Sequence, residues 1–134
     1  MSEFILPVRV YYEDTDVAGI VYYANYLRFL ERGRTEWIRT LGIDQSILIE
    51  QGLAFAVTEV NIKYLKPARF NDLLEVVTRV KQAGKASLTF EQMARNKENP
   101  DLIYCQGEVK AVCVRMDKMK PVALPERIVE EVSQ

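Results

Sequence analysis

The organisation of this chain depends on residues 11–41, which read YYEDTDVAGIVYYANYLRFLERGRTEWIRTL. The stretch starts with residues typical of a strand, breaks at residues 14–16 and passes through a small-residue turn at Ala18 and Gly19. After the turn, apolar side chains recur mostly every three or four positions, at Tyr26, Leu27, Leu30, Trp37, Ile38 and Leu41. This spacing predicts an amphipathic helix with one buried face.

The expected helix covers residues 24–41 and would be about 27 Å long, at roughly 1.5 Å per residue. Asn25 is a candidate N-cap, and Gly42 is a natural stop signal. The opposite face is charged, and Arg32 and Glu36 are spaced to form a surface pair.

Two carboxylates, Asp14 and Asp16, lie within a few residues of the start of this helix. A helix N-terminus exposes unpaired N–H groups and the positive end of the helix dipole, so it can polarise a carbonyl or hold an anion. One interpretation is that both carboxylates only cap the turn and offset the dipole. The other is that one of them acts together with the helix end in a reaction.

The rest of the chain is predicted to be mainly β-strand. Strand-like segments are residues 4–13, 54–66, 73–82, 86–96 and 102–116, and short helical segments are expected at residues 44–52 and from Pro125 onward. Pro67, directly after the second strand, indicates a bulge or an edge position. One long helix combined with five strands predicts an α+β fold in a single domain, residues 1–134, with the strand order left open.

Composition narrows the functional classes. The 134 residues have a formal net charge of −1 and no basic cluster, which argues against a nucleic-acid surface. No signal-peptide pattern or membrane-spanning apolar run is visible. Cys105 and Cys113 fall in one expected strand, roughly 26 Å apart and beyond disulfide reach, and the chain has no histidine. We therefore expect a reduced, cytoplasmic protein without a metal site or a redox cofactor.

Residues 13–37, EDTDVAGIVYYANYLRFLERGRTEW, resemble the signature of hotdog-fold acyl-CoA thioesterases of the 4-hydroxybenzoyl-CoA thioesterase family. The likeness is greatest to the YbgC-type branch, the thioesterase associated with the Tol–Pal cluster of bacteria. It extends to PVRVYYEDTD at residues 7–16, LAFAVTEVNIKYLKPARFND at 53–72 and VCVRMDKMKPVALP at 112–125. One departure is that many proteins of this branch have histidine where this chain has Tyr23.

The resemblance implies a hotdog fold, in which a curved antiparallel five-stranded sheet wraps around one long helix. It also implies that subunits pair into a continuous sheet, so a homodimer or a homotetramer is expected. The implied reaction is hydrolysis of an acyl-CoA thioester to a carboxylic acid and free coenzyme A, with no cofactor other than the coenzyme A of the substrate.

Asp16 matches the catalytic aspartate of the family. Thioester hydrolysis needs a nucleophile or a base, together with a group that stabilises charge on the carbonyl oxygen. Whether Asp16 would attack the carbonyl or activate a water is open. By resemblance, the backbone N–H of Tyr23 would donate to the thioester oxygen, while its side chain offers only a phenol. Gly19 would let the substrate approach the main chain closely.

Three further residues are candidates for contact with the acyl group. Val21 and Tyr22 belong to the signature, and Tyr22 could line an acyl tunnel, although aromatic residues near a helix start are more often core. Glu31 matches a position that touches the acyl group across the dimer in relatives that act on aromatic thioesters. A surface pair with Arg28 or Arg34 is the alternative for Glu31.

Basic residues are expected around the phosphates of coenzyme A. Lys85 and Lys120 match family positions that meet the nucleotide, and Arg69 is a further candidate because of its place beside Pro67. Each of these is also an ordinary surface cation in the alternative interpretation.

Three other functions fit parts of the pattern. Acyl-carrier-protein thioesters share the phosphopantetheine arm with acyl-CoA and are an alternative substrate. A non-catalytic acyl-thioester-binding or scaffold protein is a second alternative, but pure binding would not require Asp16. Hotdog dehydratases are a third, and the absence of histidine argues against them.

Overall fold

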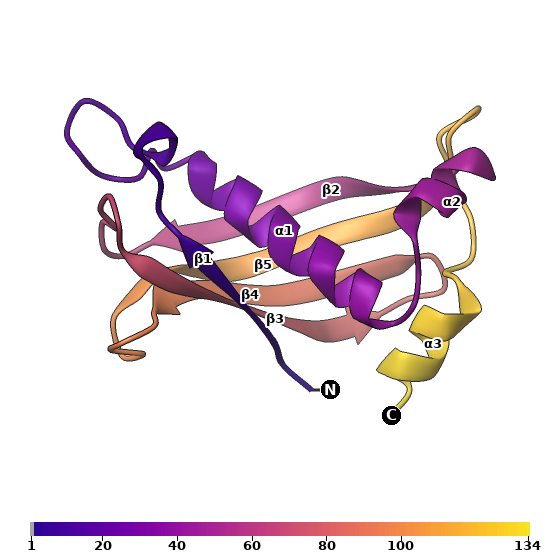
Figure 1. The fold of residues 1–134 in the computed structure, drawn as a ribbon. Coiled ribbons are helices and arrows are strands. Elements are labelled where there is room, and N and C mark those ends of the chain that lie inside the picture. Colours follow the sequence, from indigo (N-terminus) through magenta and orange to yellow (C-terminus); the bar gives the residue numbers. More distant parts are fainter. Residues whose placement is uncertain (1) are drawn as a thin grey trace.

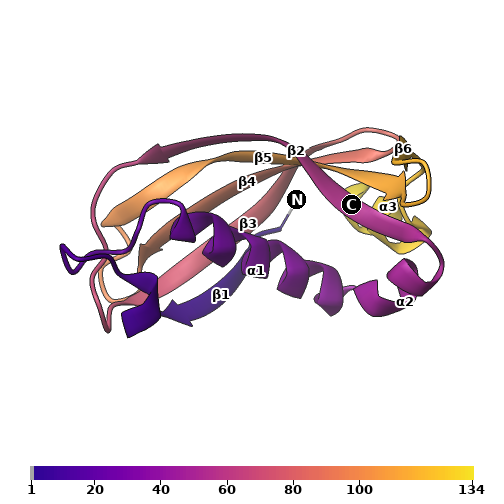
Figure 2. The ribbon, with the colours of Figure 1, turned by 90° about the horizontal axis from the view of Figure 1, so that it is seen from above.

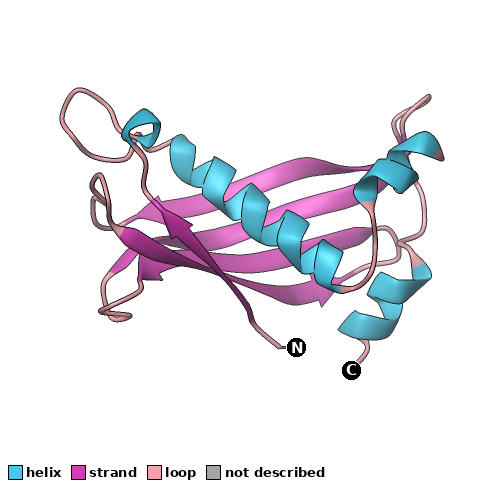
Figure 3. Cartoon of the chain, in the orientation of Figure 1, coloured by secondary structure: helices cyan, strands magenta, loops and turns pink. Residues whose placement is uncertain are grey.

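The computed structural model describes residues 2–134 as one antiparallel sheet with helices packed against it (Figures 1 and 3). The strands are β1 (Phe4–Arg9), β2 (Leu53–Tyr64), β3 (Leu73–Ala83), β4 (Ser87–Asn96), β5 (Ile103–Arg115) and the short β6 (Lys120–Pro121). The helices are α1 (Asn25–Thr40), α2 (Gln45–Glu50) and α3 (Glu126–Val132), and a short 3-10 turn spans Tyr12–Asp14.

The strands pair in the order β1-β3-β4-β5-β2, with β6 added to β5, so β1 and β2 are the two edges. Figure 2 shows that the sheet curves and that α1 lies along one of its faces. Contacts from α1 reach β1, β3 and β4. The predicted α+β class is confirmed.

Four of the five predicted strands match within two residues at each end. The first is shorter than predicted: β1 ends at Arg9 instead of residue 13, because Tyr12–Asp14 forms the 3-10 turn and the Asp14 carboxylate accepts the Tyr11 N–H at 2.8 Å. Pro67 follows an edge strand, as one of its two interpretations predicted. The register shift of β2 lies earlier, between Val57 and Glu59.

The start of α1 differs from the prediction. The N-cap is Ala24, whose side chain cannot accept a hydrogen bond, and Asn25 is the first helical residue. The Asn25 amide instead donates back to Asp14 at 2.8 Å. In α2 the N-cap is Asp44, whose side chain accepts the Ser46 N–H at 2.8 Å.

The charged face of α1 also pairs differently. Glu36 bonds to Arg39 rather than to Arg32, and the Arg32 guanidinium lies 5.7 Å from the centre of the Phe29 ring. Phe29 is fully buried although the predicted apolar stripe did not include it, whereas Leu27 is 37% exposed. The buried face is therefore rotated slightly from the predicted one.

Two apolar clusters fill the space between α1 and the sheet. The first lies under the N-terminal half of α1 and includes Val10, Val21, Tyr26, Phe29, Leu30, Ala68, Val76 and Tyr104. The second lies under the C-terminal half and includes Trp37, Ile38, Val80, Leu88, Phe90, Leu124 and Ile128.

A polar layer separates the two clusters. The Gln92 amide nitrogen donates to the Leu30 carbonyl at 2.9 Å and to the Thr78 hydroxyl at 2.8 Å, and Arg34 donates to the Gln92 amide oxygen at 3.0 Å. Gly33 makes the close approach possible, because a Cβ at this position would stand 2.7 Å from the Thr78 hydroxyl oxygen. The middle of α1 is thus fixed to the sheet by directional bonds.

Candidate active site

A hairpin-like loop connects the 3-10 turn to α1. Thr15 and Val21 form an isolated bridge, and the Asp16 N–H donates to the Ile20 carbonyl at 2.9 Å. At the tip, the Gly19 N–H donates to the Asp16 carbonyl at 3.0 Å, and Gly19 has a φ of 78°, in the left-handed region that glycine tolerates. The loop therefore has a defined backbone conformation around Asp16.

The Asp16 carboxylate is held at one oxygen. Its Oδ1 accepts the Ala18 N–H at 2.8 Å, whereas Oδ2 has no hydrogen-bond partner among residues 2–134. The residue is exposed in the single chain. A carboxylate with one oxygen fixed and one free can act as a base toward water or as a nucleophile.

The N-terminus of α1 supplies a free donor next to this loop. The Tyr22 N–H donates to the Asp14 carbonyl at 3.1 Å, and the Tyr22 carbonyl accepts the Asn25 N–H at 2.8 Å. The Tyr23 N–H between them donates to no group in the described part of the chain. At the positive end of the helix dipole, such an N–H can bind a carbonyl oxygen and stabilise negative charge on it.

Tyrosine rings surround this helix end. The Tyr22 and Tyr23 ring centres are 4.9 Å apart, and the Tyr64 ring at the end of β2 lies 5.8 Å from that of Tyr23. The hydrogen bond with the Tyr23 hydroxyl raises the pKa of Tyr22, and the negative charge of Asp16 adds a smaller effect in the same direction. The Tyr22 phenol, which has an ordinary pKa of about 10, is protonated at neutral pH.

The segment after β2 anchors the other side of the loop. The Ala68 carbonyl accepts the Val21 N–H at 2.8 Å, and the Ala68 N–H donates to the Tyr26 hydroxyl at 3.1 Å. Burial raises the pKa of Tyr26 to about 12. The Val21 side chain packs in the first apolar cluster, so Val21 contributes its backbone to the loop and its side chain to the core.

The structure brings five of the predicted site residues together: Asp16, Gly19, Val21, Tyr22 and Tyr23 all lie in the loop or at the helix start. Lys85 and Lys120 lie elsewhere, in the β3–β4 turn and in β6, at the opposite end of the sheet (Figure 1). The eleven residues of β3 separate the two ends by roughly 35 Å.

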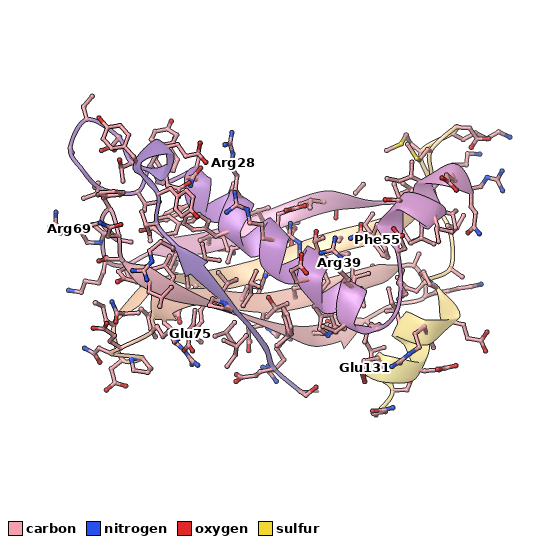
Figure 4. The ribbon with its side chains drawn as sticks, viewed as in Figure 1. Arg28, Arg39, Phe55, Arg69, Glu75 and Glu131 are labelled. Carbon is pink, nitrogen blue, oxygen red and sulfur yellow. The ribbon has the colours of Figure 1, made fainter. Side chains whose placement is uncertain are left out.

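Arg69 lies at the loop end. Its backbone forms an isolated bridge with Ile20, and Figure 4 shows its side chain pointing away from the sheet on that side. Of the basic residues considered from sequence, it is the one that a single chain places beside Asp16.

Glu31 lies farther along α1, at a cavity of about 110 Å³. It accepts a hydrogen bond from the Thr35 hydroxyl at 3.1 Å, and neither of the predicted pairs, with Arg28 or Arg34, forms. The cavity is lined mainly by Glu31, Arg34, Ile38, Phe55, Val57 and Phe90. Burial lowers the pKa of Arg34, which forms no salt bridge with any residue in the range 2–134.

The cysteines are not candidates for the chemistry. Cys105 and Cys113 are fully buried, and burial raises the pKa of the Cys105 thiol to about 11 and also raises that of Cys113. Neither thiol forms the thiolate that a nucleophile requires at neutral pH. Across residues 2–134, no cluster of three His, Cys, Asp or Glu side chains could hold a metal ion, and no helix is long and apolar enough to cross a membrane.

Comparison with known proteins gives a consistent result. Residues 10–132 match the family model of the thioesterase-like superfamily. An acyl-CoA thioesterase YbgC from Haemophilus influenzae is 48% identical over 93% of this chain and 90% of its own length. An acyl-CoA thioester hydrolase YbgC from Escherichia coli is 45% identical over 98% and 96%.

Among solved structures, a 1,4-dihydroxy-2-naphthoyl-CoA thioesterase from Synechocystis superposes with a TM-score of 0.92. The match covers 99% of this chain and 97% of that chain, at 22% identity, and it shows a common hotdog fold.

Proposed function

The chain belongs to the thioesterase-like superfamily, and on that premise we propose that it hydrolyses acyl-CoA thioesters to a carboxylate and free coenzyme A. The observation that carries the proposal is the position of the free Asp16 oxygen in the loop that leads into α1, at whose N-terminus the Tyr23 N–H has no partner among residues 2–134. These two groups are the minimum that thioester hydrolysis requires.

In the proposed reaction, the thioester carbonyl oxygen accepts a hydrogen bond from the Tyr23 N–H. Asp16 then acts in one of two ways. As a nucleophile, its free oxygen attacks the carbonyl carbon and expels the thiolate, and water hydrolyses the resulting anhydride. As a base, it takes a proton from a water that attacks the same carbon. Both routes end with a carboxylic acid and a thiol, and neither needs a metal or a redox cofactor.

The proposed active unit is a dimer formed through β2. This strand has twelve residues, and its outer edge has no strand partner within residues 2–134. Apolar side chains along it are exposed, namely Val57, Val60 and Tyr64. A long, apolar, unpaired edge strand is unfavourable in a monomer and favours pairing with another strand.

Two-fold pairing of β2 would also complete the substrate site. An antiparallel β2–β2 pair places the start of one strand beside the end of the other. The end of the sheet that carries Lys85 and Lys120 in one subunit would then approach the Asp16 loop of the second subunit. These lysines are therefore proposed to bind the coenzyme A phosphates across the interface, and assembly of dimers into tetramers stays a prediction.

Two further parts of the proposal follow from the substrate and the cysteines. An acyl-carrier-protein thioester is the proposed second substrate, because only the phosphopantetheine arm needs to reach Asp16. Two buried cysteines that form no disulfide fit a cytoplasmic protein.

The test is thiol release from short aliphatic, long aliphatic and hydroxybenzoyl-CoA by the wild type and by Asp16→Asn. Asparagine keeps an oxygen that can accept the Ala18 N–H but is neither a base nor a nucleophile, so kcat should fall at least a hundredfold with an unchanged melting temperature. Asp44→Asn is the matched control. Asp44 also accepts the N–H of the residue two positions later, that of Ser46 at 2.8 Å, and it lies far from the Asp16 loop. An Asp16→Asn enzyme that keeps the wild-type rate would exclude the assignment.

A further inference from the structure

We infer that Asp14 and Asn25 form a positioning pair that holds the Asp16 loop and the helix N-terminus in their reactive arrangement; this inference rests on the proposed function. Neither residue would touch the substrate. Both are buried, at 7% and 8% exposure, directly behind the groups proposed to react.

Asp14 joins three parts of the chain that meet at the loop. Its Oδ2 accepts the Tyr11 N–H at 2.8 Å, before the loop, and its Oδ1 accepts the Asn25 side-chain amide at 2.8 Å, on the first residue of α1. Its backbone carbonyl accepts the Tyr22 N–H at 3.1 Å. One residue thus fixes the entry of the loop, its exit and the start of the helix.

The buried position explains why these residue types are present. A buried carboxylate is unfavourable unless its oxygens accept hydrogen bonds, and each Asp14 oxygen has one donor. Its negative charge near the N-terminus of α1 also interacts favourably with the helix dipole. If the Asn25 side chain had capped the helix, it would have bonded only to the helix backbone. The observed bond instead joins Asn25 to Asp14, on the strand side of the loop.

The pair controls the distance between the two reactive groups. The Asp14 carbonyl engages the Tyr22 N–H, so the first N–H without a partner after it, among residues 2–134, is that of Tyr23. Asp16 is only two residues after Asp14, so a rotation of Asp14 moves the Asp16 carboxylate as well as the Tyr23 N–H. A misplacement of about 1 Å can reduce a reaction rate by about a hundredfold.

The experiment uses the full-length protein and an exchange of the two side chains. Asn25→Asp places two carboxylates against each other, and Asn25→Ala removes the donor together with the rest of the amide group. In the double variant Asp14→Asn/Asn25→Asp, the amide introduced at position 14 can still accept the Tyr11 N–H and can donate to the carboxylate introduced at position 25. We expect kcat to fall about ten- to hundredfold in both single Asn25 variants, with KM within about threefold, and to return to within about threefold of wild type in the exchanged pair.

Three readouts separate positioning from general structure. Melting temperature and circular dichroism identify variants that do not fold. If Asn25→Asp does not fold, Asn25→Ala and the exchanged pair still test the inference. The split between kcat and KM is the third readout, because a general loss of structure would also raise KM. Folded single variants with wild-type kcat, or an exchanged pair no faster than Asn25→Asp, would overturn the inference.

Asp16→Asn, assayed alongside, separates this inference from the proposed function. If Asp16→Asn keeps the wild-type rate, the proposed function fails. If Asp16→Asn is inactive while Asn25→Ala retains full kcat, only the positioning role fails.

Discussion

The polar layer beneath α1 allows a quantitative test of how the helix is held. Gln92 is 2% exposed and uses both its amide nitrogen and its amide oxygen, in bonds to Leu30, Thr78 and Arg34. We consider Gln92→Leu, which keeps the approximate size of the side chain but removes all three bonds.

The expected cost can be assembled from the environment of each partner. The Thr78 hydroxyl is fully buried and would lose a partner, which costs about 1–3 kcal/mol. Arg34 is partly exposed, so water replaces much of its lost bond. The Leu30 carbonyl can retain its bond within the helix. A buried leucine recovers part of the loss through apolar contact with both clusters, on the order of 1 kcal/mol. About 1 kcal/mol remains for the part of the charged Arg34 bond that water does not replace, and this offsets the gain from leucine. The net destabilisation should therefore be about 1–3 kcal/mol, a substantial part of a typical total of about 5–15 kcal/mol.

Urea unfolding of a double-mutant cycle provides the assay. Thr78→Val alone should destabilise the protein, because it leaves the Gln92 amide with one unpaired hydrogen. Thr78→Val/Gln92→Leu removes both polar groups, so its free energy of unfolding should lie within about 1 kcal/mol of wild type. This loss is much smaller than the sum of the losses in the two single variants. Additive effects, or a Gln92→Leu variant as stable as wild type, would refute the interpretation that the layer holds α1 through paired polar groups.

Two further predictions use other features of the fold. Gly33→Ala should destabilise the protein by about 1–2 kcal/mol in the same assay despite the better helix propensity of alanine, because its Cβ would stand 2.7 Å from the Thr78 oxygen and 2.8 Å from a Val76 methyl; an unchanged or higher stability would contradict the close packing. Val60→Lys, on β2, should shift the protein toward monomer in light scattering and reduce turnover. The control is Val129→Lys on α3, which should change neither mass nor turnover, because Val129 is 44% exposed and Val60 43% exposed. Equal masses for Val60→Lys and wild type would exclude the β2 interface.

Periodicity predicted most of the secondary structure. The spacing of apolar residues located α1 to within one residue at each end, and four strands were placed within two residues. The error at the end of β1 has a specific cause: the Asp14 side chain competes with strand pairing for the Tyr11 N–H. Strand order is not encoded in a pattern of single residues. The family resemblance, which the family model and the relatives confirm, supplied the hotdog fold, and the strand order itself came from the structure.

The candidate site could be predicted only in part. Asp16, Gly19 and Tyr23 are close in sequence, so one loop was enough to bring them together, and their roles stay predictions. The partners of Asp14 and Gln92 could not be predicted, because both bonds join residues far apart in the chain or across the helix–sheet interface. Gln92 did carry a signal, since it occupies an inward position of β4 between Phe90 and Ala94.

The two attachments of α1 should have separable effects. Gln92 binds the Leu30 carbonyl in the middle of the helix, and Asp14 binds Asn25 at its start, five residues earlier. The helical backbone between these points is stiff, so weakening the middle attachment lowers the free energy of unfolding without changing the relative placement of Asp16 and the Tyr23 N–H while the protein is folded. Breaking the terminal attachment changes that placement directly. Gln92→Leu should therefore lower stability with little change in kcat, whereas Asn25→Ala should lower both, because it also leaves a buried Asp14 oxygen without a donor. If both variants changed stability and kcat in the same proportion, the helix would not be acting as a rigid element between the two attachments.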